Sequence, residues 1–209
     1  MAGRGAVEAQ DQTPHPRVLA FNKTKQWVPA SEPLHWDKPK IAGVGPGFAF
    51  GKIVADGAPN ITVGLVPCAM GGSPIERWAE DGDLFKAALA RAKEAARTGT
   101  LKGILWHQGE SNVSLSTEAY AEKIKGVIAA FRKELALPDL PMIVGTLADF
   151  KTGNDNVNAA LLAVPKHIPH TACVESKGLK HKGDNLHFDA PSARELGKRY
   201  AEAWKTLGK

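Results

Sequence analysis

The sequence predicts an α/β fold in which a mainly parallel sheet is covered by helices. From residue 61 onward, short runs rich in valine and isoleucine alternate with longer segments of helical period, and this alternation is typical of parallel strands joined by helices. The composition suits a globular core, because 43% of the 209 residues are hydrophobic and 23% are charged. A chain of this length favours one core, so we predict a single domain over residues 1–209.

Four segments are predicted to be strands buried inside this sheet. Each is short and mostly apolar, and they span residues 61–66, 101–106, 142–147 and 170–174. Residues 1–60 differ, because seven prolines interrupt them. For that segment we predict loops, one short helix over residues 46–56, and no apolar strand.

Two longer helices are predicted from apolar stripes at helical spacing. The first spans residues 118–135, with Ser116 as its N-cap. The second begins at Asp189, which caps it, and carries Pro191 in its first turn. The predicted buried stripes consist of Ala119, Tyr120, Ile124, Val127, Ile128, Phe131 and Leu135 in the first helix, and of Ala193, Leu196, Tyr200, Ala203 and Leu207 in the second.

Charge and cysteine usage exclude several classes of function. The net charge is +5, but the basic residues are spread along the chain rather than massed in one block, so we predict no nucleic-acid partner. No run approaches the roughly 18 apolar residues of a membrane span, so we predict no membrane partner. The two cysteines, Cys68 and Cys173, are too few for a disulfide framework or a cysteine-based zinc site. Both are predicted to be small buried apolar residues.

Polar residues gather in loops that follow the predicted strands, where open parallel sheets place their functional groups. After the first strand, Gly71 and Gly72 allow a sharp turn and can present backbone N–H groups to an oxyanion. After the second, residues 107–112 contain five hydrogen-bonding side chains, among them Gln108 and Glu110. A glutamine amide can donate to an oxyanion, and a carboxylate can anchor the loop or bind a substrate hydroxyl. Both loops are also compatible with tight turns of purely structural importance.

The loop after the fourth predicted strand contains a pattern with more specific chemistry. Asp184 stands three residues before His187, and on a turn its carboxylate can accept a hydrogen bond from the imidazole. That bond would fix the tautomer and leave the other ring nitrogen available as a general base. We therefore predict that His187 is a general base oriented by Asp184. Five other histidines lack such a partner nearby in sequence and are predicted to lie at the surface or to serve packing: His15, His35, His167, His170 and His181.

Four segments, in this order, resemble the SGNH-hydrolase superfamily in its sialate O-acetylesterase-like branch, which includes the acetylxylan esterases of carbohydrate esterase family six. They are residues 45–51 (GPGFAFG), 71–75 (GGSPI), 103–112 (GILWHQGESN) and 184–188 (DNLHF). The resemblance implies a three-layer α/β/α, flavodoxin-like domain that removes acetyl groups from sugar hydroxyls through an acyl-enzyme. It implies an acetylated carbohydrate as the substrate, no cofactor and no metal.

The same resemblance implies a role for each candidate residue. His187 would take the proton of the nucleophile, and Asp184 would steady the imidazolium that forms. Gly72 and Gln108 would form the oxyanion hole. Support of the loops or of the substrate would come from Gly71, Glu110 and Asn112.

The resemblance also implies a nucleophilic serine that lies outside this sequence. In the family, the motif Gly-Gln-Ser-Asn-Met-Ala-Gly-Arg-Gly ends the first strand, and this chain begins with Met1-Ala2-Gly3-Arg4-Gly5. In that register the serine and its strand lie upstream of Met1. We therefore expect the chain to be N-terminally incomplete and to have little esterase activity by itself. Ser73 and Ser111 lie in the candidate loops, but neither stands in a nucleophile-elbow pattern such as Gly-x-Ser-x-Gly.

Two other functions fit parts of the pattern. A metal-dependent hydrolase could use four nitrogen and oxygen ligands, namely His107, Glu110, Asp184 and His187. A non-catalytic carbohydrate-binding protein could stack sugars on the tryptophans Trp27, Trp36, Trp78 and Trp106. The position of Trp106 at a strand end favours a place in the core.

Overall fold

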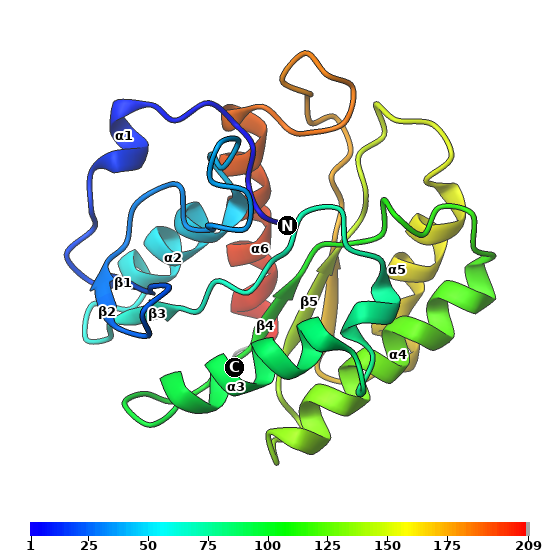
Figure 1. Ribbon diagram of the computed structural model, residues 1–209, viewed down its shortest axis with the longest axis horizontal. Coiled ribbons are helices and arrows are strands. Elements are labelled where there is room, and N and C mark those ends of the chain that lie inside the picture. The colour runs from blue at the N-terminus through cyan, green and yellow to red at the C-terminus, as the bar shows by residue number, and fades with distance from the viewer. Residues whose placement is uncertain (208–209) are drawn as a thin grey trace. The chain divides into compact units, whose positions relative to one another are not determined.

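The computed structural model describes residues 1–207 (Figure 1). These residues form two compact units. The first unit consists of Met1–Gly71 and Gly178–Glu202. The second consists of Gly72–Lys177 together with the residues from Ala203 onward. Each unit contains a sheet of three strands. The α/β class predicted from the sequence is confirmed.

The sheet of the first unit has the order β2-β1-β3, with β1 spanning Val18–Phe21, β2 Trp27–Pro29 and β3 Val63–Leu65. Strands β1 and β2 pair antiparallel, whereas β1 and β3 are parallel. The prediction that residues 1–60 contain no strand is therefore wrong. The strand β1 has only four residues, which is too short for an alternating pattern to stand out among prolines. Pro29 is tolerated because β2 lies at the sheet edge.

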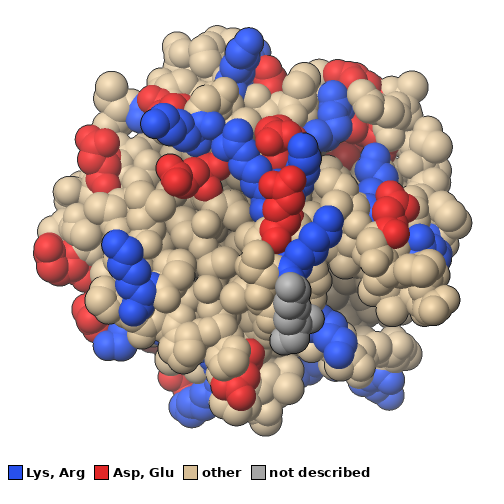
Figure 2. Space-filling model, turned by 180° about the vertical axis from the view of Figure 1, so that it is seen from behind, with Lys and Arg blue, Asp and Glu red and all other residues tan. Residues whose placement is uncertain are grey.

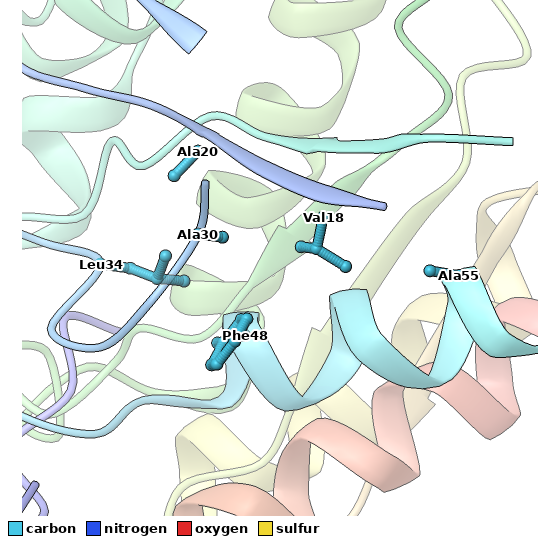
Figure 3. Close-up of a cluster of buried hydrophobic side chains, with 6 residues drawn as sticks. All are labelled: Val18, Ala20, Ala30, Leu34, Phe48 and Ala55. Carbon is cyan, nitrogen blue, oxygen red and sulfur yellow. The ribbon is translucent and has the colours of Figure 1, made fainter. Parts of the chain in front are cut away.

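Helix α2 (Pro46–Asp56) covers one face of this sheet and has the predicted bounds. Gly45 is its N-cap, and Pro46 stands in its first turn, where the missing N–H costs nothing. The short helix α1 (Ala9–Gln12) precedes the sheet. The side chains between α2 and the strands form a buried apolar cluster (Figure 3), which consists of Val18, Ala20, Ala30, Leu34, Phe48 and Ala55.

Helix α6 (Ala190–Leu207) begins where the sequence predicts. Asp189 caps it, since its Oδ1 accepts a hydrogen bond from the Ser192 N–H at 2.8 Å. Gly197 allows α6 to approach α2 closely, because a Cβ there would lie 2.4 Å from the Pro46 carbonyl oxygen. Of the predicted stripe, Ala193, Leu196 and Tyr200 are buried, whereas Ala203 and Leu207 are only partly buried.

Glu32 is a buried carboxylate that holds the start of α2. Its Oε1 accepts from the Gly45 N–H at 3.1 Å, and its Oε2 accepts from the Leu34 N–H at 2.9 Å. Only 4% of the residue is exposed. Burial raises the pKa of the Glu32 carboxyl from 4.5 to about 7, although the two backbone hydrogen bonds oppose this shift.

We expect Glu32 to make the protein less stable as the pH rises from about 4.5 to 7. In that window the unfolded chain releases the Glu32 proton while the folded chain still binds it, so unfolding becomes easier by about 3 kcal/mol at the upper end. Glu32→Gln should remove this part of the pH dependence. Urea unfolding at pH 5 and pH 8 measures it, with Glu202→Gln on the exposed side of α6 as the control. An unchanged pH slope in Glu32→Gln would contradict the assignment.

The sheet of the second unit is fully parallel, with the order β4-β5-β6. Its strands span Ile104–Trp106, Met142–Gly145 and Thr171–Val174. Together with β3, they confirm the four predicted strands with shorter bounds. The central strand β5 is buried along its whole length, as expected for a parallel sheet.

Four helical segments belong to the second unit: η1 (Ile75–Trp78), α3 (Asp83–Ala95), α4 (Thr117–Glu134) and α5 (Asp155–His167). Helix α4 confirms the predicted helix, and the Ser116 side chain caps it by accepting from the Ala119 N–H at 3.2 Å. Helices α4 and α5 lie side by side (Figure 1).

Charges of both signs are interspersed on the face shown in Figure 2 rather than gathered into one basic patch. Over residues 1–207, none of the helices combines the length and apolar character needed to cross a membrane. Neither cysteine takes part in a disulfide in this part of the chain. Both are half-buried rather than fully buried as predicted, and burial still raises the pKa of the Cys173 thiol to about 12.

Candidate active site

Asp184 and His187 lie on a tight turn that immediately precedes α6 in the first unit. A single antiparallel bridge between His181 and Phe188 closes the base of this turn. Inside it, the Lys182 N–H donates to the His187 carbonyl at 2.9 Å. We refer to residues 181–188 as the histidine turn.

The imidazole of His187 is in direct contact with the Asp184 carboxylate. The distance from Nδ1 to Oδ2 is 2.7 Å, and because a carboxylate can only accept, the proton lies on Nδ1. The other carboxylate oxygen, Oδ1, accepts from the backbone N–H groups of Leu186 at 3.0 Å and His187 at 2.8 Å. Three hydrogen bonds therefore fix the carboxylate. They leave Nε2 of His187 with the lone pair that a general base needs.

Asp184 is charged under all ordinary conditions. Burial by itself would raise the pKa of its carboxyl, but the hydrogen bonds from the His187 backbone and ring and from the Leu186 backbone outweigh this effect. The pKa of Asp184 is therefore held well below its usual range. Lys182 places a positive group nearby, with its Nζ 3.6 Å from Oδ2 of Asp184.

Gln108 follows β4 in the second unit and is buried. Its Nε2 donates to the Ser73 carbonyl at 3.0 Å and to Asn112 Oδ1 at 2.8 Å. Both amide hydrogens are thus used within this unit. For Gln108 to donate to an oxyanion, one of these two hydrogen bonds must be exchanged for a bond to the substrate. The bond to the Ser73 carbonyl is the longer of the two.

Tyr120, in the first turn of α4, contacts the oxygen atoms of Gln108. Its hydroxyl lies 2.8 Å from the Gln108 carbonyl oxygen and 3.1 Å from Oε1. Burial raises the pKa of this hydroxyl well above its usual range, so it remains a donor. The sequence predicts Tyr120 only as a member of an apolar stripe.

Asn112 connects this loop to the segment after Gly72. Its Oδ1 accepts from the Ile75 N–H at 2.8 Å as well as from Gln108. Its Nδ2 donates to Glu76 at 3.0 Å. Only 4% of Asn112 is exposed, so these bonds are not in competition with bulk water. Glu110 is half-buried in the same loop, and its role as a support stays a prediction.

A buried ion pair holds Gly71, the last residue before the chain enters the second unit. Arg4 Nη2 lies 2.6 Å from Asp37 Oδ2, and the same oxygen accepts from the Gly71 N–H at 2.8 Å. Burial would raise the pKa of the Asp37 carboxyl, but hydrogen bonds from Arg4 and Gly71 lower it. A Cβ on residue 71 would lie 2.5 Å from Arg4 Nη2, so any residue larger than glycine would push on this ion pair. The next residue, Gly72, has a positive φ of 75°.

The two alternative functions receive no support from these residues. No group of three or more histidine, cysteine or acidic residues within residues 1–207 is arranged to hold a metal ion. His107 is fully buried, and burial lowers its pKa to about 3. Trp78 and Trp106 are buried, and their rings meet edge to face with 5.5 Å between the ring centroids. Neither of these two rings therefore offers a surface on which a sugar could stack.

Comparisons with known proteins give the family of the chain. The profile of the family described as "Carbohydrate esterase, sialic acid-specific acetylesterase" matches residues 1–206. An Arabidopsis thaliana protein named "Probable carbohydrate esterase" is 35% identical over 225 aligned residues, which cover 98% of this chain and 86% of that protein. Human sialate O-acetylesterase is 26% identical over 130 residues, covering 48% of this chain and 25% of the enzyme.

Two solved structures are similar. An X-ray structure of an Arabidopsis thaliana protein superimposes with a TM-score of 0.91 at 33% identity, covering 99% of this chain and 93% of that one. A carbohydrate acetylesterase from Xanthomonas citri has a TM-score of 0.69 at 19% identity, covering 92% of this chain and 49% of that one, and shows likeness of fold alone. The fold is the predicted three-layer α/β/α class. The chain belongs to the family of carbohydrate esterases described as sialic acid-specific acetylesterases.

Proposed function

We propose that this protein removes acetyl groups from sugar hydroxyls, with His187 as general base and Asp184 as the residue that orients it. The observation that carries this proposal is the 2.7 Å contact between His187 Nδ1 and the Asp184 carboxylate. A carboxylate with a lowered pKa favours the Nδ1–H tautomer, so Nε2 is ready to accept a proton. Membership of a carbohydrate esterase family supplies the substrate class.

The proposed reaction proceeds through an acyl-enzyme. His187 Nε2 takes the proton of a serine hydroxyl as the serine oxygen attacks the acetyl carbonyl. The protonated imidazole then gives this proton to the departing sugar oxygen, and Asp184 stabilises the positive charge in between. Water, activated by the same histidine, releases acetate and restores the serine.

The negative oxygen of the tetrahedral intermediate needs donors, and we assign this role to the Gly72 N–H and the Gln108 amide. Such a donor typically contributes about 3 kcal/mol to transition-state stabilisation. Support for Gly72 comes from its positive φ of 75° next to the fixed Gly71. Support for Gln108 comes from the bonds to Tyr120 and Asn112, which hold its amide in one orientation.

We assign the nucleophile to the serine of the family motif that residues 1–5 resemble, which stands two residues before the methionine. We define the extended protein as this chain joined, before Met1, to a strand that ends in the family motif Gly-Gln-Ser-Asn. The matched control is the same protein with Gly-Gln-Ala-Asn in place of Gly-Gln-Ser-Asn.

The extended protein should hydrolyse p-nitrophenyl acetate far faster than either the control or residues 1–209 alone. Loss of the nucleophile in serine hydrolases lowers kcat by about 10⁶-fold. Initial rates on p-nitrophenyl acetate measure this difference. Equal and substantial rates in all three proteins would show that the nucleophile lies within residues 1–209, with Ser73 and Ser111 as the next residues to replace.

A further inference from the structure

A second histidine, His181, lies inside the histidine turn and makes contacts that its sequence neighbours did not indicate. Its Nδ1 accepts from the backbone N–H of Gly183 at 3.0 Å and from that of Asn185 at 3.3 Å. A ring nitrogen that accepts two N–H groups must carry a lone pair, so the proton of a neutral His181 lies on Nε2. Its tautomer is opposite to that of His187.

The two amides that His181 binds belong to the residues on either side of Asp184. Gly183 and Asn185 both have left-handed backbones, with φ of 112° and 52°. Glycine and asparagine are among the residues that adopt such conformations most readily. Since it binds both amides, His181 fixes the direction from which the Asp184 side chain leaves the backbone. No other side chain in the described part of the turn binds these two amides.

His181 is itself held at the base of the turn. It forms the bridge with Phe188, a buried residue. The residue before it, Lys180, accepts from the Asp189 N–H through its carbonyl and donates from its own N–H to the Ser192 hydroxyl. The half-buried ring of His181 thus has a fixed attachment to the start of α6. The tip of the turn, by contrast, is exposed.

We infer that His181 is a positioning residue for esterase catalysis: its Nδ1 lone pair holds the backbone on both sides of Asp184, so that the carboxylate meets His187 Nδ1. This inference rests on the proposed function, in which His187 is the general base. His181 does not touch the substrate or the reacting atoms in this assignment. It acts by narrowing the range of orientations that the Asp184 and His187 side chains adopt.

Three substitutions separate this role from simple packing. His181→Phe keeps a ring of similar shape but has no acceptor. His181→Asn places its amide oxygen near the position of Nδ1, whereas His181→Gln places it near that of Nε2. The exposed His167 at the end of α5 gives the control variant His167→Phe.

The first measurement is long-range ¹H–¹⁵N correlation on the histidine rings of residues 1–209, which needs no catalytic activity. We expect the proton on Nδ1 in His187 and on Nε2 in His181 for the unsubstituted protein. In His181→Phe and His181→Gln, His187 should populate both tautomers, and in His181→Asn and His167→Phe it should keep one. Thermal unfolding checks that all variants fold.

The second measurement is kinetics in the extended protein. His181→Phe should lower kcat about tenfold with KM changed less than about twofold, because orientation rather than substrate binding is lost. His181→Asn should recover most of kcat.

A proton on Nδ1 of His181 in the unsubstituted protein would overturn the inference, and so would a single His187 tautomer in His181→Phe. If His187→Ala keeps its esterase rate, the proposed base is wrong, yet the ring spectra still decide whether His181 holds the turn.

Discussion

Replacing His187 by alanine in the extended protein is expected to lower kcat on p-nitrophenyl acetate by at least about 10⁴-fold. The substitution removes the only group that we assign to take the serine proton and to return it to the leaving group. KM should change little, because the imidazole contributes more to the transition state than to substrate binding. Steady-state kinetics at several substrate concentrations separate the two parameters.

Asp184→Asn tests the same pair of residues through the tautomer of the His187 ring. The asparagine amide can present an N–H where the carboxylate presents only oxygen, so His187 Nδ1 can become an acceptor and Nε2 can lose its lone pair. A fall in kcat of roughly 10³–10⁴-fold is expected. His167→Ala, on the exposed end of α5, is the control and should leave kcat unchanged. For the His187→Ala protein, a kcat that stays at a tenth or more of the normal value would contradict the assignment of His187 as the general base.

Replacing Asp37 by alanine is expected to lower the free energy of unfolding by about 3–5 kcal/mol, because a buried cation loses its partner. The side chains of Asp37 and Arg4 are only 1% and 5% exposed. The Gly71 N–H also loses the oxygen to which it donates. Urea unfolding followed by tryptophan fluorescence measures the change.

Asp83→Ala provides a matched control for Asp37→Ala. It breaks an ion pair with Arg77 whose side chains are 63% and 43% exposed, and such pairs contribute less than about 1 kcal/mol. The double substitution Arg4→Met with Asp37→Leu should recover much of the loss, since it removes both buried charges. Equal losses in Asp37→Ala and Asp83→Ala would show that the buried pair has no special importance for stability.

The elements that the sequence predicts correctly are those with local signals. Helix α2 has a proline at its start, α4 has Ser116 as a side-chain cap, and α6 has Asp189. Asp184 and His187 could also be predicted as a pair, because three residues on a turn are enough to bring them together.

Contacts between residues distant in sequence leave no such signal. The strand β1 is stabilised by partners that include Val63, 45 positions beyond Val18. Asp37 binds Arg4, 33 positions away, and Gln108 binds the Ser73 carbonyl, 35 positions away. Nothing in the residues near Asp37 or Tyr120 marks them as partners of a functional loop.

His181 is a different case, because its partners are only two and four residues away. The sequence assigns it no partner and predicts a surface or packing histidine. Its partners are backbone N–H groups, which every residue except proline has. They meet the ring in a turn where Gly183 and Asn185 both have a positive φ, which the sequence does not specify.

Deacetylation of a sugar by the extended protein is the most direct test of the central claim. ¹H NMR can follow the O-acetyl methyl signals of acetylated xylooligosaccharides and of O-acetylated sialic acid in parallel, with the His187→Ala variant beside each. We predict that at least one of these sugars loses its O-acetyl signal as free acetate appears, and that the variant leaves it intact. Persistence of the acetyl groups on both sugars while p-nitrophenyl acetate is cleaved would contradict a carbohydrate acetylesterase function.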